Sequence, residues 1–209
     1  MNNNKQARYA HPSSSLTQTA CRLVLRALGW YVAPFPDVKK AVVVGGPHTS
    51  NWDGLLGLVG AAALGLQANI LIKSNLFFWP LGPILRRFGA IPINRQQKTG
   101  VVEQAAEQFK QREQLIMVVT PEGTRSNAPK WKTGFYHIAQ QASVPIVVAT
   151  ADYGKKEITY PAVVMPSGDI DADFDTFYAL FASITPKHPS KLSAPVKALF
   201  DAKHKSQAN

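Results

Sequence analysis

The sequence predicts a single α/β domain with a mixed, largely parallel sheet covered by helices on both faces. Three observations support this fold class. Short apolar runs rich in β-branched residues alternate with longer stretches of helical periodicity, which is typical of a sheet with crossover helices. The length of 209 residues suits one domain, and no linker-like stretch divides the middle of the chain. With 45% hydrophobic and 17% charged residues, the chain is too apolar to be disordered.

The first 36 residues divide into a polar start and a basic amphipathic helix. Residues 1–13 are polar, and we expect them to be loose. From residue 16 to residue 32, a helical pattern brings the apolar side chains near one face, while Arg22 and Arg26 share another. The apolar side chains are those of Leu16, Ala20, Leu23, Val24, Ala27, Leu28 and Tyr31. A helix of this kind over residues 14–36 can lie on a membrane surface or pack on the domain.

The domain proper is expected to span residues 37–190, with strands and helices in alternation. Apolar β-branched runs predict strands at residues 41–44, 69–73, 90–93, 115–119, 145–150 and 158–164. Helical periodicity predicts helices at residues 52–64, 99–112 and 133–142. Two further helical pieces follow residue 171, divided around Pro186 and Pro189, and residues 191–209 form a basic C-terminal helix and tail.

The charge of the chain indicates an anionic partner. The formal net charge is +10, and the basic excess is concentrated at the two ends. Such an excess is typical of proteins that bind nucleic acid or an anionic membrane surface. Nucleic-acid binders interleave aromatic with basic residues or carry a reading helix, whereas this chain has an apolar middle. We therefore expect a membrane surface and no nucleic acid as a partner.

Composition also bears on localisation. The single cysteine, Cys21, excludes an intramolecular disulfide and a multi-cysteine zinc site, and it fits a reducing compartment. No secretory signal is evident, and no stretch reaches the roughly 20 apolar residues of a spanning helix. We expect a cytoplasmic protein that associates peripherally with the cytoplasmic face of the membrane.

The first stretch whose residues can carry out chemistry follows the strand at 41–44 and reads GGPHTSNWD over residues 45–53. His48 on the loop and Asp53 in the next helical turn can meet if Ser50 or Asn51 caps that helix. A carboxylate beside one imidazole nitrogen raises the basicity of the other, so we expect the pKa of His48 to lie above its usual value near 6.5. The pair predicts a general base whose nucleophile belongs to the substrate, with a structural histidine as the alternative.

The second stretch follows the strand at 115–119 and reads TPEGTRS over residues 120–126. Gly123 permits a tight turn, and Arg125 offers a fork of donors suited to phosphate. Thr124 and free backbone N–H groups can complete an anion site, and Glu122 can bind a hydroxyl or orient Arg125. The alternative is a capped turn with a surface ion pair. Because chemistry in such sheets lies beyond the carboxyl ends of strands, both stretches are candidates for one site.

Together with two further segments, these stretches resemble the glycerolipid acyltransferase family, the lysophosphatidic acid acyltransferase-like enzymes. The four family motifs occur in the family's order: His-x4-Asp at His48 and Asp53, GAIPINR at 89–95, EGTRS at 122–126 and VPIV at 144–147. The second motif departs from the family in having Asn94 where Asp is frequent, but Arg95 is retained. The resemblance covers residues 42–150, about half of the chain.

The resemblance implies a division of labour. His48 would be the general base on a glycerol hydroxyl and Asp53 its partner. The hydroxyl would attack the thioester of acyl-CoA or of an acyl carrier protein, with 1-acylglycerol 3-phosphate as the acceptor. The residues expected to bind substrate are Arg95, Glu122, Gly123, Thr124, Arg125 and Lys73. The reaction needs no cofactor or metal, and the sequence offers no His-Glu-x-x-His spacing.

Two alternatives remain open at this point. The same chemistry can act on another lysolipid, such as a lyso-ornithine lipid, or the scaffold can bind lipid without catalysis. The apolar stretch from residue 76 to residue 81 can line an acyl tunnel, dip into a bilayer or belong to the core.

Overall fold

The computed structural model describes residues 15–94, 96 and 100–207. The expected loose start at 1–13 and the candidate Arg95 lie outside this part of the chain. A sheet of seven strands has the order β1-β7-β6-β2-β5-β3-β4. Its strands are β1 (Tyr31–Val32), β2 (Lys40–Gly46), β3 (Ala68–Lys73), β4 (Ala90–Ile93), β5 (Leu115–Val119), β6 (Ile146–Asp152) and β7 (Glu157–Val164). Neighbouring strands are parallel except β6 and β7, which confirms the predicted mixed, largely parallel sheet.

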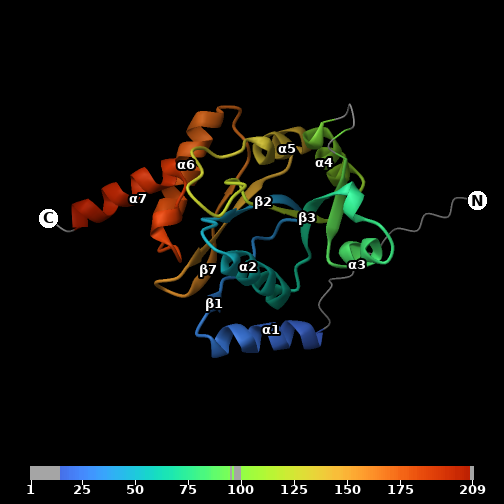
Figure 1. The fold of residues 1–209 in the computed structure, drawn as a ribbon, viewed down its shortest axis with the longest axis horizontal. Helices are drawn as coiled ribbons and strands as arrows, with labels where there is room; N and C mark the ends of the chain where they lie inside the picture. The colour runs from blue at the N-terminus through green and yellow to red at the C-terminus, as the bar shows by residue number, and fades with distance from the viewer. Residues whose placement is uncertain (1–14, 95, 97–99, 208–209) are drawn as a thin grey trace, which may run out of the picture.

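Helices cover both faces of the sheet, as expected (Figure 1). On the lower side in the figure lie α1 (Ser15–Ala27), α2 (Asn51–Leu64) and α3 (Leu81–Arg87), and α1 packs beneath α2. On the upper side lie α4 (Val101–Lys110), α5 (Gly134–Ala142) and α6 (Ile170–Ala182), while α7 (Ala194–Gln207) follows α6 and extends outward. Short 3₁₀ turns occupy Ser74–Leu76 and Pro189–Lys191. This arrangement follows from right-handed crossovers between parallel strands.

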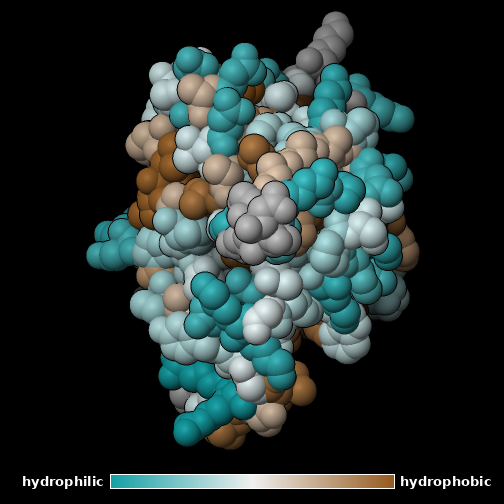
Figure 2. Space-filling model, turned by 90° about the vertical axis from the view of Figure 1, so that its left-hand side faces the viewer, coloured by the Kyte–Doolittle hydropathy of each residue, from teal (hydrophilic) through white to brown (hydrophobic). Residues whose placement is uncertain are grey.

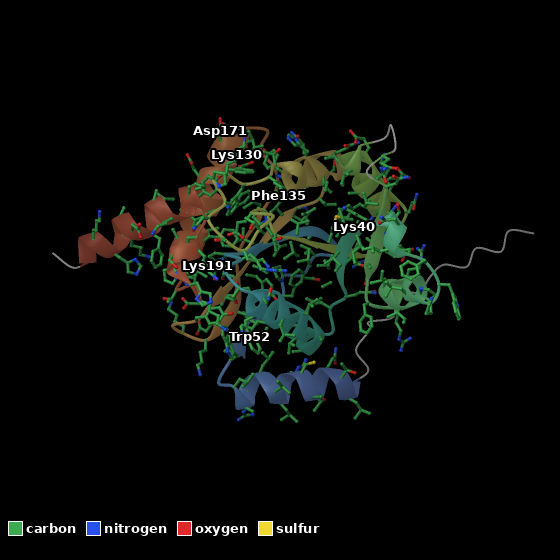
Figure 3. The ribbon with its side chains drawn as sticks, in the orientation of Figure 1. Lys40, Trp52, Lys130, Phe135, Asp171 and Lys191 are labelled. Atoms are coloured by element: carbon green, nitrogen blue, oxygen red, sulfur yellow. The ribbon has the colours of Figure 1, made fainter. Side chains whose placement is uncertain are left out.

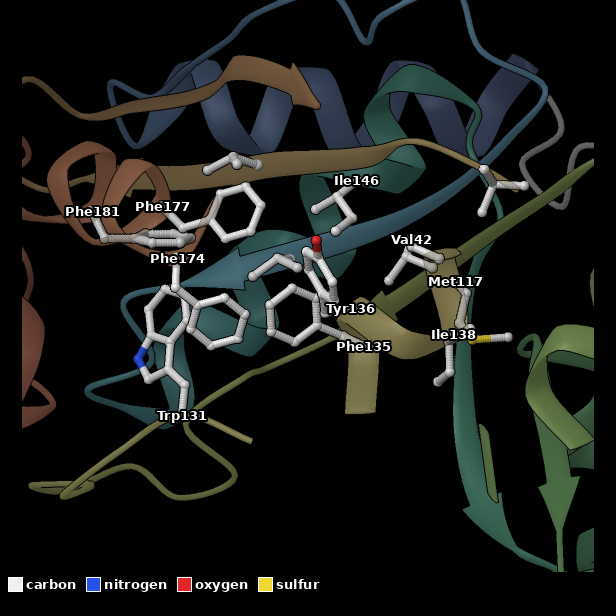
Figure 4. Packing of buried hydrophobic residues seen from close by; sticks show 14 of the residues in the cluster. Val42, Met117, Trp131, Phe135, Tyr136, Ile138, Ile146, Phe174, Phe177 and Phe181 are labelled. Carbon is white, nitrogen blue, oxygen red and sulfur yellow. The ribbon is translucent and has the colours of Figure 1, made fainter. Parts of the chain in front are cut away.

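The central strand β2 shows why the apolar runs are continuous. Val42 and Val44 belong to the cluster between the sheet and the upper helices, while Ala41 and Val43 belong to the cluster on the opposite face. All four are buried, because a central strand covered on both sides has no solvent face. Figure 4 shows the upper cluster, in which aromatic rings of α5 and α6 gather around Trp131.

Helix α1 is shorter than the sequence pattern predicted. The helix was expected to run to residue 32, but it ends at Ala27. Gly29 takes a left-handed conformation with φ of 75°, and the N–H of Trp30 bonds to the carbonyl of Leu25, which closes the helix. Tyr31–Val32 then pairs with β7, so this part of the expected helix belongs to the sheet.

The apolar side of α1 faces outward. The helix packs on the domain through Leu25, which is buried, while Leu16, Leu23 and Leu28 are exposed. Leu23 is 61% exposed. At the lower edge of the molecule in Figure 2, where α1 lies in Figure 1, exposed apolar residues stand beside hydrophilic ones. None of the helices within the described ranges is long and apolar enough to cross a bilayer.

Candidate active site

The two stretches singled out in the sequence meet at the carboxyl edge of the sheet. They follow β2 and β5, which are adjacent parallel strands. The backbone N–H of His48 donates to Oε2 of Glu122 at 2.8 Å, so the loop after β2 is bonded directly to the loop after β5. The expectation that both stretches lie together at one edge of the sheet is therefore confirmed.

Asp53 is fixed in the first turn of α2. Figure 3 labels Trp52, the residue before it on the same helix. Ser50 is the N-cap residue, and Asp53 completes a capping box with it. Oδ2 of Asp53 accepts the backbone N–H groups of Thr49 and Ser50, both at 2.7 Å. Oδ1 accepts the hydroxyl of Tyr153 at 2.6 Å. The carboxylate is thus held by three short hydrogen bonds.

The environment of His48 corrects one expectation from the sequence. In the described part of the chain, its imidazole makes no hydrogen bond to Asp53, and the two groups interact through charge. Burial lowers the pKa of His48 from its usual value near 6.5, the negative charge of Asp53 opposes this shift, and the positive charge of Arg125 adds to it. The predicted rise of this pKa is wrong, because removing the imidazole from water outweighs the carboxylate. His48 is neutral, and able to accept a proton, at neutral pH.

Glu122 is a buried carboxyl group, only 6% exposed. Burial raises its pKa to about 7, against the lowering effect of the hydrogen bond from His48, and the charge of Asp53 raises it further. Glu122 therefore changes its charge near neutral pH, directly beside the histidine.

The loop after Glu122 brings cations to the same edge. Gly123 has φ of +64°, and a Cβ atom there would lie 2.6 Å from the side chain of Lys132, so no other residue fits without moving that lysine. Thr124 and Arg125 are exposed on the loop, and Arg125 is close enough to influence His48 electrostatically. Arg125 and Lys132 give this end of the site a positive charge.

A cavity of about 530 Å³ leads from these polar groups along the lower face of the sheet, between the sheet and α2. His48, Asp53, Gly123 and Lys132 line it at the carboxyl edge. The remaining lining is mainly apolar and includes Val43, Leu58, Ile116, Val118 and Tyr160. The cavity extends to Ala68 and Ile116, which are paired at the opposite end of the sheet. It combines a charged entrance with an apolar body, as a lipid requires.

The structure does not gather every predicted residue. Lys73 is exposed at the end of β3 and does not line the cavity as the structure describes it. Glu122, Thr124 and Arg125 lie on the loop after β5 but are not among the lining residues either. Sequence analysis missed Lys132 and Tyr153. Tyr153 follows directly after β6, a neighbour of β2, so the rule that chemistry lies beyond strand ends could have found it. Within residues 15–94, 96 and 100–207, no three His, Cys, Asp or Glu side chains are grouped to hold a metal ion.

Comparisons with known proteins identify the family of the chain. The sequence model of the acyltransferase family matches residues 31–151, more than half of the chain. The solved structure of PlsC, a 1-acyl-sn-glycerophosphate (LPA) acyltransferase from Thermotoga maritima, is similar at 16% identity and a TM-score of 0.48, over 74% of this chain and 70% of that one. No curated protein matches the sequence closely enough to add a further comparison. The matched segment contains His48, Asp53 and residues 122–126, and the protein belongs to the acyltransferase family, as its motifs predicted.

Proposed function

We propose that the protein transfers a fatty acyl group from acyl-CoA or an acyl carrier protein to a hydroxyl of a lysophospholipid, with 1-acylglycerol 3-phosphate as the acceptor. The observation that carries this proposal is the cavity, which joins His48, the carboxylate of Asp53 and the ammonium group of Lys132 at one end to a long apolar lining. A phosphate-bearing lipid has the same division between a charged head and an apolar chain.

The reaction follows from the positions of the groups. The neutral imidazole of His48 accepts the proton of the acceptor hydroxyl as its oxygen attacks the thioester carbonyl. The tetrahedral intermediate collapses by breaking the carbon–sulfur bond, and the protonated His48 returns the proton to the leaving thiolate. Asp53 stabilises the imidazolium through its charge. Holding the two substrates together lowers the activation free energy further, and the proposed reaction uses no cofactor.

We assign binding of the acceptor phosphate to Lys132, which lines the cavity, and to Arg125, whose charge reaches His48. Arg125 offers paired donors and Lys132 a point charge, so together they can neutralise a phosphate. Glu122 and Gly123 shape the loop that carries Arg125. We retain Arg95 and Thr124 as further candidates from their places in the family motifs, and Lys73 from its place at the end of β3.

The reaction is tested by incubating the purified protein in detergent with long-chain acyl-CoA, and separately with acyl carrier protein, against a panel of lysolipids. We expect a diacyl product from 1-acylglycerol 3-phosphate, identified by mass spectrometry. Transfer only to a lyso-ornithine lipid or another lysolipid would replace the proposed acceptor. Lipid binding without transfer to any member of the panel would contradict the catalytic function.

Filling the cavity is expected to change the choice of acyl chain. Gly57 lies on α2 and lines the cavity, and a side chain there would enter open space. Gly57→Leu should keep the helix, because leucine favours helices by close to 1 kcal/mol over glycine. We expect the rate of transfer of long acyl chains to fall by about tenfold or more and that of medium chains to fall less, because the added side chain occupies part of the cavity.

The measurement is the ratio of initial rates with long-chain and medium-chain acyl-CoA. Gly134→Leu is the matched control, since Gly134 is also a helical glycine with open space around it but lies on α5, away from the cavity. An unchanged ratio in the Gly57→Leu protein would show that acyl chains do not occupy this cavity.

We also propose that the protein associates peripherally with the cytoplasmic face of a membrane. The outward face of α1 is apolar, and Arg26 is exposed on the same helix, whereas Arg22 donates to the carbonyl of Ala63 on α2. The segment around α3 adds exposed Phe78, Trp79 and Phe88, with Trp79 85% exposed, so of the three uses considered for residues 76–81 we retain contact with the bilayer. Both helices lie on the side of the sheet that holds the cavity (Figure 1). Large exposed apolar side chains beside cations are typical of interfacial surfaces.

Vesicle binding tests this surface. We expect Leu23→Glu to weaken binding to anionic phospholipid vesicles by about tenfold or more. The substitution removes an apolar side chain that would be buried in the bilayer, and the anionic headgroups repel the new carboxylate. Co-sedimentation at increasing vesicle concentration measures the effect, and raising the salt should weaken binding by the wild-type protein. Leu199→Glu on α7 is the control, since Leu199 is also exposed but lies on another helix. Equal binding by the Leu23→Glu and wild-type proteins would exclude α1 as the contact.

A further inference from the structure

Among the donors of short hydrogen bonds to the carboxylate of Asp53, Tyr153 is the one that is distant in the sequence. The other two short hydrogen bonds to that carboxylate come from Thr49 and Ser50, the residues just before α2. The hydroxyl of Tyr153 comes from 100 residues further along the chain and reaches Oδ1 at 2.6 Å. It therefore joins the end of β6 to the beginning of α2.

The structure fixes Tyr153 on several sides. Its backbone N–H donates to the carbonyl of Thr185 at 2.8 Å. Its ring meets the ring of Trp30 edge to face, with 5.1 Å between centroids, and the ammonium group of Lys187 lies 5.8 Å from its centroid. Oδ1 of the preceding Asp152 accepts the N–H groups of Gly154 and Lys155, which fixes the turn after β6. A side chain held in this way is already in place before any substrate arrives.

The phenol is the donor in this contact. Burial raises the pKa of Tyr153 well above its usual value near 10, and the hydrogen bond and negative charge of Asp53 raise it further. The hydroxyl consequently keeps its proton across the neutral range, and an ionised carboxylate can only accept.

We propose that Tyr153 is a positioning residue for the acyl transfer, acting through Asp53 on the general base His48. Its hydroxyl holds the carboxylate in one orientation and draws part of the negative charge away from His48. The role deepens the proposed function and rests on it. Tyr153 itself exchanges no proton with the substrate.

Tyr153→Phe is the decisive variant, because phenylalanine keeps the ring that packs on Trp30 and removes only the hydroxyl. A hydrogen bond to a charged group is worth roughly ten- to a hundredfold in rate when it is used in the transition state. We expect kcat to fall by about that factor, because the carboxylate of Asp53 is no longer held in one orientation, with the KM of donor and acceptor little changed. The acid limb of the pH–rate profile should move to higher pH, because the undispersed charge of Asp53 stabilises protonated His48 more strongly.

A second readout does not depend on activity. The imidazole Cε1–H signal of His48, assigned by its loss in a His48→Asn protein, is followed by NMR as the pH is changed. We expect its titration midpoint to move to higher pH in Tyr153→Phe and to stay in place in Tyr178→Phe. Tyr178 is the control because its ring packs against Trp131 in the core on the other side of the sheet.

The outcomes separate the two proposals. A midpoint and a kcat that match the wild type would overturn the role of Tyr153. A shifted midpoint in a protein that transfers no acyl group would refute the proposed function, yet it would leave the action of Tyr153 on Asp53 and His48 supported. A fall in kcat with an unchanged midpoint would also overturn the role, because the loss would then be structural.

Discussion

Replacing His48 with alanine is expected to lower the rate of acyl transfer by a factor of about 10² to 10⁴, the usual contribution of a general base. The loss should fall on kcat, because His48 acts on the reacting hydroxyl. Folding should be little affected, since the hydrogen bond from residue 48 to Glu122 uses the backbone N–H and survives the substitution. Initial rates at saturating substrate measure the effect, with thermal melting and vesicle binding as controls.

The pH dependence of the wild-type rate adds a second check on the same residue. A general base must be neutral to accept a proton, and burial lowers the pKa of His48. The rate should therefore hold as the pH falls to about 6.5 and decline only below it. An acid limb centred above that value that persists in a Glu122→Gln protein, or transfer by the alanine variant at the wild-type rate, would remove His48 from the mechanism.

Replacing Glu122 with glutamine is expected to stabilise the protein at alkaline pH. The folded state raises the pKa of Glu122 from 4.5 to about 7, so folding holds a proton that the unfolded chain releases between these values. The contribution of protonated Glu122 to the free energy of unfolding is fully present below pH 4.5 and is lost as the pH rises through 7. A shift of this size corresponds to about 3 kcal/mol. Glutamine stays neutral throughout, and its amide oxygen can still accept the N–H of His48.

The quantity to measure is the free energy of unfolding by urea for both proteins at a series of pH values. The advantage of the glutamine variant should grow from near zero at about pH 4.5 to about 3 kcal/mol at about pH 8. Because the two proteins share every other titrating group, their difference isolates Glu122. Glu113→Gln, at an exposed site, is the control. A difference that does not vary with pH would mean that Glu122 is not a buried acid in solution.

The fold and the meeting of the motifs could be predicted because they depend on local patterns and on one rule of topology. The run at 41–44 is apolar without interruption, since β2 is buried on both faces. Ser50 was among the expected caps of the next helix, and it forms the capping box. Once β2 and β5 are parallel neighbours, their carboxyl ends must share an edge, which brings His48 to Glu122.

What could not be predicted depends on distances that a single sequence does not contain. The direction of the pKa shift of His48 depends on the balance between burial and the charge of Asp53, and the sequence shows only the charge. The periodicity of α1 defined an apolar face but could not show that this face points away from α2. Tyr153 reaches Asp53 only because β6 lies beside β2.

The two outer strands of the sheet have a consequence for self-association. An outer strand with free N–H and C=O groups can recruit a strand from another molecule and begin an aggregate. Here β1 is two residues long and offers almost no template. At the other border, β4 has four residues, and Pro92 has no N–H to donate. The same chain therefore gains little from pairing with its copies, even at high protein concentration.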